Sequence, residues 1–235
     1  MSTLCTICAR GGSQGIKNKN IKRILNIPLI VYTINTAIKS KIFDKIILST
    51  DSNEIINICK KYKIDIFFKR PKSLSSSNVN KIEVIKHALL KSEHKYNINF
   101  DYIFDLDVSS PLRTSKDIIN SFNLFLKKKS VNSFSVIPAN KNPYFNIIEK
   151  KLNTYKPVSK PKSIIYSRQK APTVYYMNAS IYIWKREALI KSKTVFNDKT
   201  SIYIMNERCI DIDNVNDFEL VDFYIKKYKK WQILK

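Results

Sequence analysis

All three glycines of this 235-residue chain lie within five consecutive positions, at Gly11, Gly12 and Gly15. They follow directly after a short apolar run, Leu4–Ala9, which predicts a buried strand. Glycine is needed where the backbone adopts a positive φ or approaches a ligand closely. Polar and basic residues surround the glycines: Arg10, Ser13, Lys17 and Lys19. The segment ARGGSQGIKNKN (9–20) therefore predicts a turn whose N–H groups and cations bind phosphate. It matches neither a Walker A loop nor G-x-G-x-x-G, and the alternative is a plain structural turn.

Two acidic pairs, Asp105-Leu-Asp107 and Asp211-Ile-Asp213, follow strand-like runs. Residues i and i+2 of an extended backbone share one face, so each pair can aim two carboxylates at one cation. Mg²⁺ is held in proteins by one or two carboxylates together with waters and substrate phosphates. The alternative for either pair is a structural one, in which the aspartates cap the turn after the strand.

The elements that position these residues alternate between two patterns. Strand-like runs are Leu4–Ala9, Lys45–Thr50, Ile64–Phe68, Tyr102–Leu106, Ser133–Pro138, Ser180–Trp184 and Ser201–Met205. Helix-like runs are Pro28–Ser40, 53–62, Lys81–Ser92, a stretch after Thr114, a short stretch after Trp184 and Val215–Trp231. Ser52 and the T-x-x-D sequence at Thr114 are N-cap signals. This alternation predicts an α/β fold with a mostly parallel, Rossmann-like sheet and helices on both faces. The turns at the carboxyl ends of its strands are where ligands bind.

The alternation stops after Pro138. Residues 138–178 contain four further prolines and many polar residues: Pro143, Pro157, Pro161 and Pro172 are the prolines. Long segments without regular structure usually have a function. With no internal repeat, we expect a single domain over residues 1–235 with an arm at about 138–178.

The net charge of +23 raises the possibility of a nucleic-acid partner. Only seven of the 42 basic residues are arginine, however, and the lysines are spread along the chain. Arginine is the usual residue for phosphate forks and base edges. We therefore expect no nucleic acid as the main partner, and a basic surface that attracts small polyanionic substrates.

No apolar run reaches the roughly 18 residues of a membrane-spanning helix, and the N-terminus lacks the basic region of a signal peptide. Cys5 and Cys8 have redox or zinc spacing. On a strand, residues three apart point to opposite faces, so the two thiols cannot pair. We expect buried structural cysteines, a cytoplasmic location and no membrane partner.

In their order along the chain, these motifs resemble those of the cytidylyltransferases that activate nonulosonic (sialic-acid-like) sugars as CMP-sugars. The matching segments cover most of the chain: ARGGSQGIKNKN (9–20), ILSTDS (47–52), FFKRP (67–71), SSPLRT (109–114), SRQ (167–169), MNASIYI (177–183) and DID (211–213). The sequences DLDVSSPLR, CTICARGGS and KNPYF look closest to the subgroup that acts on N,N'-diacetyllegionaminic acid.

The resemblance implies that the anomeric hydroxyl of the sugar attacks the α-phosphate of CTP and that pyrophosphate leaves. Catalysis would be mainly positioning and charge neutralisation. Arg10 and Lys19 would hold the triphosphate and stabilise the leaving group. The residues implied to lie along the rest of the nucleotide are Gly11, Gly12, Ser13, Asn20 (ribose or phosphate) and Arg70 (cytosine).

The resemblance also implies a metal and a sugar side. Asp211 and Asp213 would hold Mg²⁺ and belong to the catalytic set, while Arg168, Gln169 and Asn178 would face the sugar. It implies a homodimer in which the arm reaches the partner's site.

Three positions depart from the family pattern. Gln14 stands where a lysine is usual, and Phe145 replaces a lysine often found in the arm. Asp107 stands where sialic-acid enzymes carry a glutamine, which leaves two roles open: it reads the sugar, or it joins Asp211 and Asp213 on Mg²⁺.

Three alternative functions remain open for this sequence. A CMP-N-acetylneuraminate synthase would differ only in its sugar. A nucleotide-sugar glycosyltransferase would use Asp105 and Asp107 as its metal motif, but leaves the basic glycine turn unexplained. A basic RNA-binding protein would need clustered arginine or a nucleic-acid motif.

Overall fold

The computed structural model describes residues 1–13, 15–160, 165–205, 209–228 and 231. Within these residues a six-stranded sheet has the order β10-β6-β9-β5-β1-β4. Its strands are β1 (Thr3–Cys8), β4 (Lys45–Ser49), β5 (Tyr102–Leu106), β6 (Asn132–Pro138), β9 (Tyr175–Lys185) and β10 (Thr200–Ile204). β1 is parallel to β4 and β5, and β10 is parallel to β6, whereas β9 runs antiparallel between β5 and β6. The predicted α/β fold with a mostly parallel sheet is confirmed.

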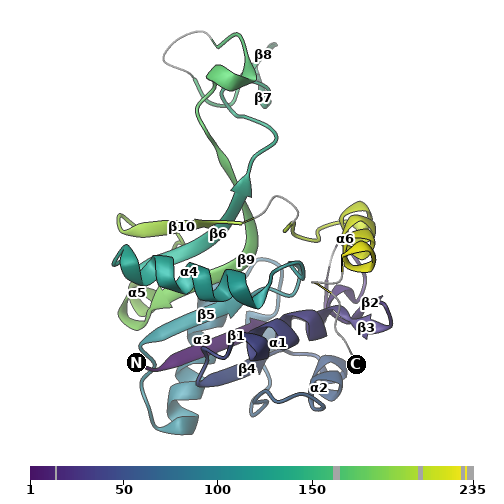
Figure 1. The fold of residues 1–235 in the computed structure, drawn as a ribbon, viewed down its shortest axis with the longest axis vertical. Helices are drawn as coiled ribbons and strands as arrows, with labels where there is room; N and C mark the ends of the chain where they lie inside the picture. Colours follow the sequence, from purple (N-terminus) through teal and green to yellow (C-terminus); the bar gives the residue numbers. More distant parts are fainter. Residues whose placement is uncertain (14, 161–164, 206–208, 229–230, 232–235) are drawn as a thin grey trace.

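Helices cover both faces of this sheet (Figure 1). One face carries α1 (Leu29–Ser40) and α4 (Ser115–Lys127), and the opposite face carries α3 (Lys81–Tyr96) and α5 (Arg186–Lys191). α2 (Asn53–Cys59) and α6 (Val215–Lys227) add apolar side chains to the core on the α1 side. Both predicted N-caps are confirmed, because Ser52 accepts from the backbone of α2 and Thr114 forms a capping box at α4.

Side chains of successive strand residues enter two separate cores. On β1, Leu4 belongs to the core beneath α3, whereas Cys5 and Ile7 belong to the core beneath α1 and α4. Cys8 packs on the α3 side, so the two cysteines of the C-x-x-C sequence lie on opposite faces, as the strand period predicts.

One expected strand is absent from the sheet. The run Ile64–Phe68 meets β4 through a single bridge between Ile47 and Asp65. The chain then turns away, because Phe67 packs against Tyr96 and Phe68 against His87 on α3. Aromatic burial against the helix replaces further strand pairing here. The last helix is also shorter than expected and ends at Lys227.

The segment between β1 and α1 holds the glycines and three short elements, η1 (Lys19–Ile21), β2 (Arg23–Ile24) and β3 (Ile27–Pro28). A further 3₁₀ turn, η2 (Lys72–Leu74), precedes α3. Both segments lie at the end of the sheet where the parallel strands β1, β4 and β5 finish.

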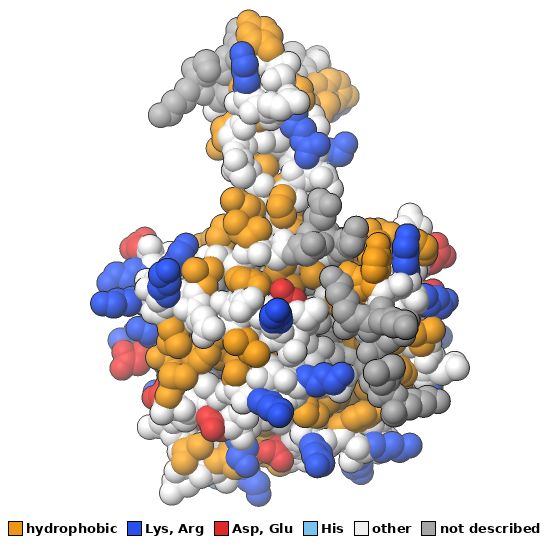
Figure 2. All heavy atoms as spheres, viewed as in Figure 1, with side chains coloured by type: hydrophobic (Ala, Val, Ile, Leu, Met, Phe, Trp, Pro, Cys, Tyr) orange, Lys and Arg blue, Asp and Glu red, His pale blue; other side chains and the backbone are white. Residues whose placement is uncertain are grey.

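The expected arm is a protrusion formed where β6 and β9 extend beyond the sheet (Figure 1). It ends in an antiparallel hairpin, β7 (Ile148–Lys151) and β8 (Thr154–Pro157), with η3 (Arg168–Lys170) close by. At its root lies an apolar hollow of about 780 Å³, lined in part by Val136, Pro143 and Tyr176. Hydrophobic side chains also gather there on the surface drawn in Figure 2. Among the described residues no helix has the length and apolar character needed to cross a membrane.

Candidate functional site

A cavity of about 440 Å³ lies at the carboxyl ends of β1 and β5. It gathers eight of the predicted site residues from distant parts of the chain: Arg10, Ser13, Lys19, Asn20, Arg70, Asp107, Asp211 and Asp213. Gly15, Lys81 and Ser109 also line it. These side chains therefore lie together at the edge of the sheet where open α/β folds bind ligands.

None of the three glycines has a positive φ, so backbone conformation does not require glycine in this turn, whereas close approach requires it at Gly15. A Cβ on Gly15 would lie 2.0 Å from the Asp213 carbonyl oxygen, which no side chain can tolerate. Gly11 donates its N–H to Asp51 Oδ1 at 2.9 Å, whereas a Cβ on Gly12 would meet no atom within 4 Å. Gly15 therefore lets the turn pack directly on the segment that carries the carboxylate pair.

Two residues of η1 hydrogen-bond the glycine turn and the segment that carries Asp211 and Asp213. Lys19 Nζ donates to the Ile212 carbonyl at 2.5 Å, between the two aspartates of the pair. Asn20 is buried and its Nδ2 donates to the Arg10 carbonyl at 2.9 Å. Lys19 thus places a positive charge at the carboxylates, and Asn20 holds the backbone that presents Arg10.

The pair Asp211 and Asp213 has a local electrostatic field that suits a cation. Asp211 Oδ1 is buried and has no hydrogen-bond partner among the described residues. Burial, followed by the charge of Asp107 and then that of Asp213, raises the pKa of Asp211 to about 6, although Ser109 and Lys19 oppose the rise. A divalent cation that prefers oxygen, such as Mg²⁺, fits this donor set together with substrate phosphates.

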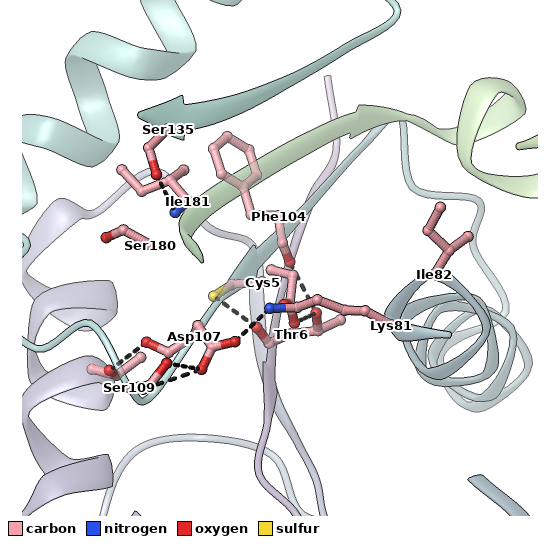
Figure 3. Close-up of polar contacts among 12 residues, drawn as sticks. Cys5, Thr6, Lys81, Ile82, Phe104, Asp107, Ser109, Ser135, Ser180 and Ile181 are labelled. Carbon is pink, nitrogen blue, oxygen red and sulfur yellow. Dashed lines mark hydrogen bonds and ion pairs between the residues drawn. The ribbon is translucent and has the colours of Figure 1, made fainter. Parts of the chain in front are cut away.

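The first acidic pair, Asp105 and Asp107, already meets a cation, the ammonium of Lys81 at the start of α3 (Figure 3). Lys81 Nζ lies 2.5 Å from Asp107 Oδ2 and 3.1 Å from Asp105 Oδ2. Asp105 is fully buried and its Oδ1 accepts from Thr6 at 2.7 Å. The i, i+2 spacing thus aims two carboxylates at one cation, as predicted, but the cation is a lysine.

The ion pairs of Lys81 with Asp105 and Asp107 favour the charged forms of Lys81 and Asp107. Burial opposes ionisation of Asp107, but Lys81 and two hydrogen bonds from Ser109 outweigh it and bring its pKa well below the usual range. Burial likewise lowers the pKa of Lys81, and the charges of Asp107 and Asp105 more than reverse that effect. Sequence reasoning missed Lys81. Its one signal is a lysine in the first turn of a helix, where the dipole disfavours a cation.

Arg70 lines the cavity as a buried cation, and some of its N–H donors have no partner within the described part of the chain. Its residue is 5% exposed, and its nearest carboxylate oxygen, Asp51 Oδ1, is 3.9 Å from Nη2. Neither Nε nor Nη2 has a hydrogen-bond partner among the described residues. A buried guanidinium without such bonds is costly unless a ligand supplies acceptors.

Three residues predicted to face the sugar do not line this cavity in their own chain. Arg168 and Gln169 are exposed on η3 in the arm. Asn178 is buried in β9, where its amide accepts from Ser135 at 2.7 Å and donates to the Cys209 carbonyl at 2.8 Å. Asn178 thus secures the segment leading to Asp211 instead of facing the cavity. Gln14 lies outside the described residues.

Comparison with known proteins places the chain in a family. The profile described as Cytidylyltransferase matches residues 4–233. The chain is 46% identical to post-translational flagellin modification protein B of Campylobacter coli, over 95% of each chain. It is 44% identical to CMP-N,N'-diacetyllegionaminic acid synthase of Campylobacter jejuni, over 94% of each chain. A solved CMP:2-keto-3-deoxy-manno-octonic acid synthetase shares the fold, with a TM-score of 0.69 at 12% identity, covering 97% of this chain and 99% of that one. The chain therefore belongs to the cytidylyltransferase family.

Proposed function

We propose that this protein activates a nonulosonic acid, of the legionaminic type, with CTP to give the CMP-sugar and pyrophosphate. One observation carries the proposal: a single cavity joins the cations Arg10, Lys19 and Arg70 to the carboxylate pair Asp211 and Asp213. Such a site suits a nucleoside triphosphate with a divalent cation. The 44% identity to a synthase named for diacetyllegionaminic acid supports the sugar class.

In the proposed reaction the anomeric hydroxyl oxygen of the sugar forms a bond to the α-phosphorus and releases its proton to solvent water, and the bond from that phosphorus to the bridging oxygen breaks. Negative charge grows on the departing pyrophosphate. Arg10 and Lys19 stabilise that charge, and Arg70 supplies its unpartnered donors to an acceptor on the nucleotide. Asp211 and Asp213 would hold Mg²⁺, which would supply further neutralisation of the triphosphate.

Asp107 is assigned to the sugar rather than to the metal. Its Oδ1 already accepts from the Ser109 N–H at 3.1 Å and hydroxyl at 2.8 Å, and its Oδ2 accepts from Lys81. An ammonium on that carboxylate repels a second cation. Asp107→Asn is therefore expected to change the ranking of nonulosonic acids and to leave the Mg²⁺ requirement unaltered.

The proposal includes a homodimer formed through the arm. The arm carries exposed apolar side chains, among them Ile148, Tyr155 and Tyr166, and an apolar hollow at its root. Burial of such surface against a second copy would be favourable. It would also bring Arg168 and Gln169 to the partner's cavity, which their own chain does not achieve.

The proposed setting is the cytoplasm, with CTP and the sugar as partners and neither nucleic acid nor membrane. Basic side chains are spread over the body and arm on the face drawn in Figure 2, where no single stripe of them dominates. A diffuse positive surface favours the approach of small polyanions such as CTP.

The test is pyrophosphate release over a panel of sugars and nucleotides. N,N'-diacetyllegionaminic, N-acetylneuraminic and pseudaminic acids are each offered with CTP, and then with ATP, GTP or UTP. We expect turnover with CTP alone and the highest kcat/KM with the legionaminic acid. A preference for N-acetylneuraminic acid would favour the alternative CMP-N-acetylneuraminate synthase, and no turnover with any sugar would refute the proposal.

A further inference from the structure

We infer that Lys81 is a specificity-determining residue, which together with Asp107 hydrogen-bonds one hydroxyl group of the sugar. This inference rests on the proposed function and deepens it. Lys81 begins α3, and its side chain crosses to the end of β5 to reach the carboxylates (Figure 3). A cation in the first turn of a helix opposes the helix dipole, so its presence there is explained by the two carboxylates it meets.

The ammonium of Lys81 keeps unused hydrogen-bonding capacity. It has three N–H groups, and among the described residues it makes one hydrogen bond, to Asp107. Asp105 contributes an ion pair at 3.1 Å, and the Tyr182 ring centroid lies 4.5 Å from Nζ. The side chain is 29% exposed and lines the cavity. At least one N–H is therefore available to a ligand.

Asp107 keeps a matching acceptor. An ionised carboxylate offers about four acceptor positions, of which the Ser109 N–H, the Ser109 hydroxyl and Lys81 use three. A free acceptor and a free donor thus stand side by side on two groups held 2.5 Å apart.

A hydroxyl is the ligand group that such a pair fits. Its hydrogen can be donated to Asp107 while its oxygen accepts from Lys81, so one atom satisfies both charged groups. A secondary amide points its N–H and C=O in opposite directions and cannot satisfy both at once. Hydrogen bonds to charged groups are the stronger kind, and losing one leaves a charged group short of a partner. A sugar lacking that hydroxyl should be rejected strongly.

The same geometry excludes a metal role for the first acidic pair. Asp105 is fully buried. Among the described residues, Lys81 is the one cationic side chain within ion-pair distance of its carboxylate. The lysine occupies the position that a divalent cation would take between Asp105 and Asp107. The pair is thereby committed to orienting Lys81, and the metal is left to Asp211 and Asp213.

The test uses the double variant Lys81→Met/Asp105→Asn, which removes the ammonium without leaving the fully buried Asp105 carboxylate unpaired and keeps the net charge constant. Asp105→Asn alone is the matched control, and Lys91→Met controls for loss of an exposed lysine on the same helix. Each protein is assayed against the preferred nonulosonic acid and a panel of analogues that each lack one hydroxyl. Thermal unfolding checks that each variant is folded.

In the unmodified protein we expect one analogue of the panel to lose about 10- to 100-fold in kcat/KM, the equivalent of one hydrogen bond to a charged group. In the double variant the parent sugar should fall to the level of that analogue, while the KM for CTP and the Mg²⁺ dependence stay unchanged. Retained discrimination in the folded double variant, or an equal rise in the KM for CTP, would overturn the inference. Absence of turnover by the unmodified protein with every sugar would instead overturn the proposed function.

Discussion

The buried carboxylate of Asp211 should destabilise the metal-free protein, and Asp211→Asn should relieve that effect. Its pKa rises from an ordinary value of 3.8 to about 6 because of burial and of the charges of Asp107 and Asp213. One pKa unit corresponds to 1.36 kcal/mol, so the ionised form costs about 3 kcal/mol in the folded state. For a chain of this size that corresponds to a shift of about 6–12 °C in Tm.

The pH dependence follows from the direction of the shift. Between about pH 4 and pH 6 the folded protein holds a proton on Asp211 that the unfolded chain has already released. The free energy of unfolding therefore falls as pH rises through this window, and the full penalty is present above about pH 6. The asparagine variant lacks this contribution, so its advantage should be largest at pH 8 and largely lost near pH 4.

The assay is thermal unfolding of the unmodified protein and Asp211→Asn at several pH values, without metal or nucleotide. Asp198→Asn, which removes an exposed carboxylate, is the control and should change Tm little. Addition of Mg²⁺ and CTP should then raise the Tm of the unmodified protein by more than that of Asp211→Asn, which should also lack turnover. An Asp211→Asn protein that is no more stable than the unmodified protein at pH 8 would refute this account of the site.

Three further changes test other parts of the structure. Gly15→Ala should lower kcat at least ~10²-fold, because its Cβ would displace the Asp213 backbone. Gly12→Ala is the control and should keep near-normal activity in the same pyrophosphate assay. Equal activities of the two variants would contradict the role given to close approach at Gly15. Lys19→Met should reduce kcat at least ~10²-fold at saturating CTP, and an effect confined to the KM for the sugar would argue against its role on the triphosphate. Replacing most of residues 138–178 with a short Gly-Ser linker should yield a monomer in sedimentation velocity, whereas an unmodified chain that sediments as an active monomer would disprove the proposed dimer.

Much of the framework follows from the sequence because it depends on interactions between near neighbours. Apolar runs predicted most of the strands, and Ser52 and Thr114 predicted two helix starts, since a cap bonds backbone groups within the next three residues. The glycine turn and the pair Asp211 and Asp213 were identified by residue type, by spacing and by their position after strand-like runs. Parallel strands then bring such turns to one edge of the sheet, and the structure places both groups around one cavity.

What the sequence left open depends on packing between distant segments. The run Ile64–Phe68 has a strand pattern, but its aromatic residues gain more by packing on α3, which no local propensity reveals. Asn178 appears polar and available in sequence, and only the fold shows that it is buried in the sheet.

The cation that meets Asp105 and Asp107 was also decided by tertiary structure. The alternation of strand side chains required that the two carboxylates share a face, and it left their common partner undetermined. That partner is Lys81, 26 residues before Asp107, because α3 packs across the sheet with its first turn at the end of β5. Likewise, the need for glycine at position 15 is set by the Asp213 carbonyl, which only the folded chain brings within contact. Residue types determined what chemistry was available, and the packing of helices on the sheet determined which charges meet.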